Sequence, residues 1–178
     1  MSEKKDVYGK AKDQMRLSER ILAAIPGFHG YKEKELRRES DRLVRNHLYL
    51  KLSKMKKDLR TVSQKLSNSL WLDALRDMDH LIAKVERVSE KVNHASYGYA
   101  GFFDIVKIKE KNLDRMIDFD NNLIGDVESL AADIETFKSE LITGEAKNAK
   151  EYVARIAEKL ESFEETFDQR QEAILEVA

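Results

Sequence analysis

The sequence contains no cysteine and only one proline among its 178 residues. The absence of cysteine excludes disulfides, thiolate nucleophiles and cysteine-ligated metals, and it agrees with a reducing compartment. Residues 1–6 are mostly charged and no apolar run follows them, so they do not resemble a secretory signal. No later run is apolar enough over a length that could span a bilayer. We therefore expect a cytoplasmic protein.

The motifs of common enzyme classes are also missing. There is no Gly-x-Ser-x-Gly turn, and neither glycine pair that is three residues apart follows a strand or precedes Gly-Lys-Ser/Thr. The nearest approaches to a helical metal motif are Asp77 with His80 and Glu90 with His94, and no second helix repeats either pair. The sequence therefore predicts no metal and no cofactor, and it favours a non-enzymatic protein over an enzyme.

What the chain does contain is charge. Charged residues make up 37% of it and hydrophobic residues 42%, a mixture typical of long, exposed helices. Residues 1–111 carry a balance of +9, and residues 112–178 a balance of −10. This asymmetry has two interpretations. The favoured one is that the two halves attract each other when they pack antiparallel, and the alternative is a basic surface that serves an anionic partner.

Apolar residues recur at helical spacing in several segments. A first helix is predicted over residues 8–25, with Ile21, Leu22 and Ile25 in its buried stripe, and Pro26 and Gly27 end it. The clearest seam alternates steps of four and three residues, as in coiled coils; it consists of Leu48, Leu52, Met55, Leu59, Val62 and Leu66. The next seam is out of phase, which predicts a tight reversal near residues 67–69, with one uninterrupted helix as the alternative. This seam consists of Leu72, Leu75, Met78, Ile82, Val85, Val88 and Val92.

Two further seams lie on either side of Gly144, which stands where a helix C-cap is expected. The seam before it consists of Leu113, Met116, Leu123, Val127, Leu130, Ile134, Phe137 and Leu141. The seam after it consists of Val153, Ile156, Leu160, Phe163, Phe167 and Ile174. We predict an all-α fold in one domain, residues 1–178: an elongated antiparallel up-down-up-down bundle of two long hairpins, 32–94 and 108–177, plus the N-terminal helix.

Two short segments depart from this helical pattern, and we call them the first island, residues 25–31, and the second island, residues 95–104. Together they hold four of the seven glycines and the only proline. A hairpin that reverses near residue 68 returns the second island to the end of the bundle where the first island lies. We therefore expect Tyr31 and Tyr97 to lie at one end of the molecule.

Arginines follow the first island directly and share one helix face with Asp41. Guanidinium groups bind carboxylate or phosphate through paired hydrogen bonds and also stack on aromatic rings. The candidate binding residues are Tyr31, Arg38, Asp41, Arg42, Arg45, Tyr97, Tyr99 and Phe102. The alternative is that Arg38, Asp41 and Arg42 pair among themselves and with acidic residues of the C-terminal helix, while the tyrosines cover an apolar core.

Three functions remain open from the sequence. The favoured one is a helical interaction or scaffold module that presents this end to a protein partner, or to an anionic group at Arg38, Arg42 and Arg45. The second is a small-molecule binder or enzyme with a pocket between the islands, and the third is a self-assembling or membrane-associated structural protein. A solvated helix face explains the basic residues 51–60 better than nucleic-acid or membrane contact. A homo-oligomer is left open, because a second chain can complete an exposed seam.

Overall fold

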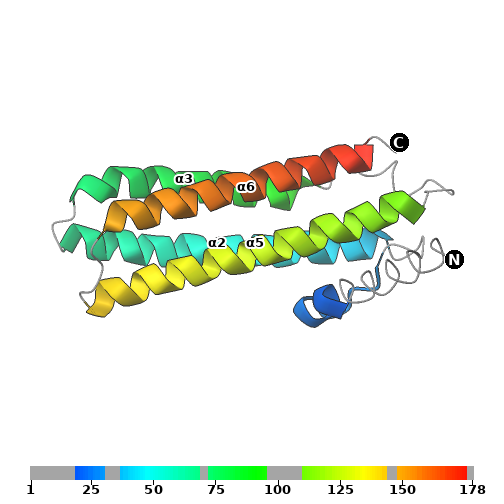
Figure 1. Cartoon of the computed structure of the whole chain (residues 1–178), viewed down its shortest axis with the longest axis horizontal. Helices are drawn as coiled ribbons and strands as arrows, with labels where there is room; N and C mark the ends of the chain where they lie inside the picture. The colour runs from blue at the N-terminus through cyan, green and yellow to red at the C-terminus, as the bar shows by residue number, and fades with distance from the viewer. Residues whose placement is uncertain (1–18, 31–36, 69–71, 96–109, 144–147, 176–178) are drawn as a thin grey trace, which may run out of the picture. The chain divides into compact units, whose positions relative to one another are not determined.

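The computed structural model describes residues 19–30, 37–68, 72–95, 110–143 and 148–175, and the regular secondary structure of these residues is entirely helical (Figure 1). The long helices are α2 (Arg37–Asn68), α3 (Leu72–His94), α5 (Glu110–Thr143) and α6 (Ala149–Leu175). Residues 19–24 are also helical. The helices pack against one another, so the predicted all-α helical bundle is confirmed.

The chain divides into two compact units, and α2, α5 and α6 contribute residues to both. Unit 1 consists of Met1–His47, Ala95–Ile124 and Thr166–Ala178, and unit 2 of Leu48–His94 and Gly125–Glu165.

In unit 2 the four long helices form a ring in which each contacts two neighbours. Lys56 of α2 donates to Glu86 of α3 at 3.0 Å, and Arg87 of α3 donates to Glu164 of α6 at 2.6 Å. Lys159 of α6 pairs with Asp133 of α5 at 2.6 Å. Lys138 of α5 closes the ring by donating to Asp58 of α2 at 3.2 Å. The order around the ring is therefore α2, α3, α6, α5.

The helices of unit 2 alternate in direction along the chain, as the up-down-up-down prediction requires. Ser53 lies 3.5 Å from Ser89 between the hydroxyl oxygens, so α3 runs back along α2. Likewise Phe137 of α5 stacks on Tyr152 of α6, with 4.6 Å between the ring centroids. In Figure 1, α5 runs in the same direction as α2, and α6 in the same direction as α3. The two hairpins are thus neighbours through their parallel helices.

The boundaries between the helices agree with the sequence in most respects. Helix α2 ends at Asn68 and α3 begins at Leu72, on either side of the predicted reversal. Asn148 caps the start of α6, because its side-chain oxygen accepts from the amide of Glu151 at 3.4 Å. Gly144 lies outside the described residues.

The core of unit 2 follows the predicted seams closely on α2 and less closely on α3. All residues of the α2 seam from Leu48 to Leu66 are buried. On α3 the predicted Leu75 and Ile82 are only half-buried, whereas Leu81 and Ser89 are buried. The reason is that the buried stripe alternates steps of four and three residues along Ala74, Met78, Leu81, Val85, Val88 and Val92. Leu75 and Ile82 each lie one residue beyond this stripe, at its edge.

Unit 1 contains the first island, and its turn has the predicted cause. Gly27 adopts φ 85° and Gly30 adopts φ 78°, a region that favours glycine. The amide of Phe28 donates to the carbonyl of Ile25 at 3.2 Å, and Phe28 is buried. The prediction that Leu22 is buried is wrong: it is 48% exposed. Ile21 and Ile25 lie one turn apart and face the core, and Leu22 points away from that face.

Truncating a core leucine should destabilise the protein far more than truncating an exposed one. Leu52 is fully buried, whereas Leu50, two residues earlier on α2, is 58% exposed. We expect Leu52→Ala to lower the free energy of unfolding by about 2 to 5 kcal/mol and Leu50→Ala by much less. Chemical denaturation of both variants measures this. Equal losses would contradict the assignment of the seam.

Acid should weaken the contact between α3 and α6. The hydrogen bond from Arg87, aided by Lys91, lowers the pKa of Glu164 to about 2 from its ordinary 4.5, against the effect of partial burial. A carboxylate with a lowered pKa in the folded state stabilises above the unfolded pKa, and this stability is lost as pH falls through the folded pKa. The stability difference between wild type and Glu164→Gln should therefore shrink between about pH 4.5 and pH 2.

Denaturation at several pH values measures this difference, with Glu158→Gln on the exposed face of the same helix as the control. A difference that stays constant over this range would show that Glu164 gains no stability from Arg87 and Lys91.

Candidate functional site

The predicted binding residues that the structure describes all lie near the start of α2, in unit 1. Arg38 and Arg42 are exposed, whereas the Asp41 side chain is 2% exposed and that of Arg45 is 11% exposed. Tyr31, Tyr97, Tyr99 and Phe102 lie outside the described residues, and so does the predicted proximity of Tyr31 and Tyr97. The pocket proposed between the two islands depends on those same residues.

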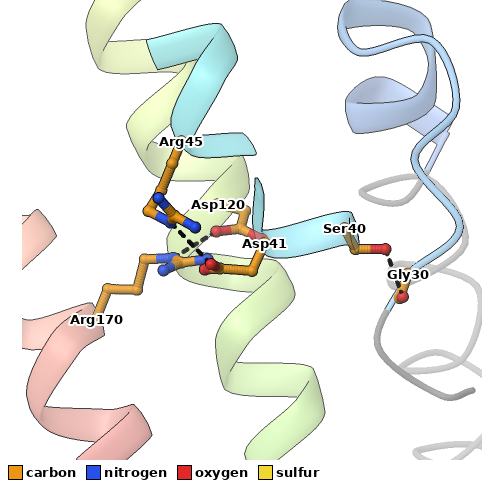
Figure 2. A network of polar contacts seen from close by, with 6 residues as sticks. All are labelled: Gly30, Ser40, Asp41, Arg45, Asp120 and Arg170. Carbon is orange, nitrogen blue, oxygen red and sulfur yellow. Dashed lines mark hydrogen bonds and ion pairs between the residues drawn. The ribbon is translucent and has the colours of Figure 1, made fainter. Parts of the chain in front are cut away.

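Asp41 belongs to a buried network of charges centred on Arg170 of α6. The Arg170 Nε donates to Asp120 of α5 at 2.7 Å, and its Nη2 donates to Oδ1 of Asp41 at 2.9 Å. Figure 2 shows Arg170 reaching from its own helix to both carboxylates. The side chains of Arg170 and Asp120 are fully buried. One guanidinium therefore joins three helices of unit 1.

Arg45 completes the network from the same helix as Asp41. Its Nε donates to Oδ2 of Asp41 at 2.8 Å, so each Asp41 oxygen accepts from a different arginine (Figure 2). These two carboxylates and two guanidiniums balance one another in charge. Removing charges from water is costly, and such groups are stable inside a protein only when close partners satisfy them. The planar, forked guanidinium suits this arrangement because its nitrogens donate in different directions.

A neighbouring hydrogen bond attaches the first island to the same turn of α2. Ser40 is buried, and its hydroxyl donates to the carbonyl of Gly30 at 2.9 Å (Figure 2). The buried side of this turn therefore contacts α6 through Asp41 and the island through Ser40, and Arg170 extends the contact to α5.

Two other arginines near the start of α2 are exposed rather than buried. Arg42 donates to both oxygens of Glu39, at 2.7 and 2.9 Å, and its side chain is 69% exposed. The hydrogen bond and the charge of Glu39 raise the pKa of Arg42. Arg38 lies one turn earlier on the same face and is also exposed. The arginines near the start of α2 thus divide between an internal network and a surface.

Two members of the buried network, Asp120 and Arg170, are not among the residues predicted from the sequence. Asp120 stands among other acidic residues, a pattern typical of a solvated helix face, but its side chain is fully buried. Their positions in the sequence could have identified them, because both stand at seam positions. Asp120 lies between Met116 and Leu123 at helical spacing, and Arg170 follows Phe167 by three residues. A charged residue at a seam position requires a buried partner.

The described Asp, Glu and His side chains were also candidates for a metal site. Among the residues described, no group of three or more His, Asp or Glu side chains is arranged to hold a metal ion. His94 contacts Glu90 at 3.3 Å, with both side chains about half exposed or more. Asp77 and His80 are both exposed.

Removing Arg170 should leave two buried carboxylates short of their partner. We expect Arg170→Ala to lower the free energy of unfolding by about 3 to 5 kcal/mol, because an uncompensated buried charge remains. Arg42→Ala is the matched control and should cost about 0 to 1 kcal/mol, since it removes an exposed pair. Denaturation with both variants measures the difference. A loss as small for Arg170 as for Arg42 would contradict the buried network.

Comparisons with known proteins leave the site to be interpreted from its geometry alone. Neither protein-family models, nor curated proteins, nor solved structures give a match to this chain. Among the helices that the structure describes, none is both long enough and apolar enough to cross a membrane.

Proposed function

We propose that the protein is a non-enzymatic helical interaction module, and that the exposed face of Arg38 and Arg42 binds acidic groups of a protein partner. The observation that supports this is that some charged side chains near the start of α2 are buried and others are exposed. Asp41 and Arg45 are used inside unit 1, whereas the neighbouring Arg38 and Arg42 are exposed. An exposed pair of arginines one turn apart can bind two carboxylates, or one phosphate, through several charge-assisted hydrogen bonds.

The buried network supports the proposal because it fixes the helix that carries these arginines. Asp41 is adjacent to Arg42 in the chain and is held from two sides, by Arg170 and by Arg45. A binding side chain on a fixed backbone loses less conformational freedom when the partner arrives. The network would thus serve recognition without contacting the partner.

The contact between Arg42 and Glu39 is compatible with exchange. It is an exposed pair between residues three apart on one helix, and such pairs contribute about 0 to 1 kcal/mol. A carboxylate of the partner can therefore replace Glu39 at small cost. Glu39 would then favour partners that present more than one acidic group.

Replacing both exposed arginines should abolish partner binding without unfolding the protein. We expect Arg38→Ala/Arg42→Ala to change the free energy of unfolding by about 1 kcal/mol or less. Affinity for the partner should fall at least about tenfold, since each charge-assisted hydrogen bond contributes about 1.5 to 3 kcal/mol. Affinity capture from the native cell identifies the partner by mass spectrometry, and titration calorimetry with the purified partner measures the affinity.

The matched control removes the same amount of charge elsewhere. Arg76 of α3 and Lys150 of α6 are exposed in unit 2, so Arg76→Ala/Lys150→Ala should retain the partner. Equal affinity for wild type and the Arg38/Arg42 variant would show that these two arginines do not bind the partner. Equal loss in both double variants would show attraction by net charge alone, which also contradicts a specific site.

A further inference from the structure

Unit 2 carries a basic stripe on the outward face of α2. The stripe consists of Leu50, Lys54, Lys57 and Thr61, all exposed and separated by steps of four, three and four residues. Arg60 lies beside it with a 58% exposed side chain. Asp58, the acidic residue of α2 in this unit, is turned toward Lys138 of α5. Leu50 is thus a large apolar side chain exposed within a positive surface.

An acidic stripe with the same spacing lies on the outward face of α6. It consists of Ala154, Glu158, Glu161 and Glu165, which are all exposed. Glu161 contacts Lys84 of α3 at 3.6 Å, and its side chain remains 65% exposed. The steps are again four, three and four residues.

The two stripes face away from each other. Within unit 2, α2 contacts α3 and α5, and α6 contacts these same two helices. Helices α2 and α6 are therefore diagonal members of the ring, and their outward faces lie on opposite edges. The stripes cannot pair with each other inside one copy of unit 2.

We infer that these stripes join copies of the chain, with α2 of one copy packed parallel to α6 of the next. In this register Leu50 lies beside Ala154, Lys54 beside Glu158, and Lys57 beside Glu161. Alternating steps of three and four residues keep two helices in contact along their length. A nucleic acid or an anionic membrane fits the basic stripe only, whereas a second copy accounts for both stripes and for the exposed Leu50.

The geometry makes the association open-ended. Each contact joins two different surfaces, which is a heterologous interface. Because the surfaces lie on opposite edges, two copies that share one contact each keep one unused stripe. The contacts are exposed ion pairs around a small apolar centre, so association is weak and salt screens it.

Sedimentation equilibrium of the purified full chain tests this inference. At about 0.05 M salt the average mass should rise with protein concentration, and at about 0.5 M salt it should return to that of one chain. Lys54→Glu/Lys57→Glu and Glu158→Lys/Glu161→Lys should each abolish the rise, because like charges then face each other. An equimolar mixture of the two variants should restore it, since the exchanged charges are again complementary.

A second mixture controls for net charge. Arg76→Glu/Lys150→Glu and Glu128→Lys/Glu135→Lys change the net charge equally, at exposed positions of unit 2 outside both stripes. We expect the mass of this mixture to show no more association than wild type at the same total concentration. A wild-type chain that stays monomeric at about 0.05 M salt overturns the inference. The inference is also overturned if the mixture of Lys54→Glu/Lys57→Glu and Glu158→Lys/Glu161→Lys associates no more than either variant alone.

Discussion

The architecture of unit 1 depends on the pairing of Arg170 with Asp41 and Asp120. These groups come from three helices, and each is almost completely removed from water. A buried pair gains little net stability over apolar packing, but the loss of one member is costly. The network therefore acts mainly as a constraint. An arrangement of α2, α5 and α6 that separates these side chains leaves a charge buried without a partner, so the pairing selects one register.

The same constraint explains why some residues of α2 are buried in contacts and others are exposed. Where a residue near the helix start faces inward, as Ser40 and Asp41 do, it binds another segment of unit 1. Their neighbours on the helix, Arg38 and Arg42, stay exposed. Further along α2, in unit 2, the inward face becomes the apolar seam from Leu48 to Leu66. The inferred function and the inferred self-association both use exposed side chains of this helix, at positions whose backbone is fixed by buried neighbours.

Sequence reasoning succeeded where local spacing decides the outcome. The α2 seam, the phase break after Leu66 and the positive φ of Gly27 all follow from residue spacing or backbone geometry. It failed where a neighbour in space decides. Spacing marks Asp120 and Arg170 as seam positions, but their pairing depends on how three separate helices align. The exposure of Leu22 likewise depends on which side of its short helix meets the core. For the second island, the predicted residues lie outside the described part of the chain.

A double-mutant cycle between Asp120 and Arg170 tests the central claim most directly, because it measures their interaction apart from the cost of each substitution. The variants are Asp120→Leu, Arg170→Met and the two combined, and the observable is the free energy of unfolding. Each single variant should lose about 3 to 5 kcal/mol. The double variant should lose markedly less than the two together, since Asp41 keeps Arg45 as its partner. Losses that simply add would contradict a direct, buried pairing of these two side chains.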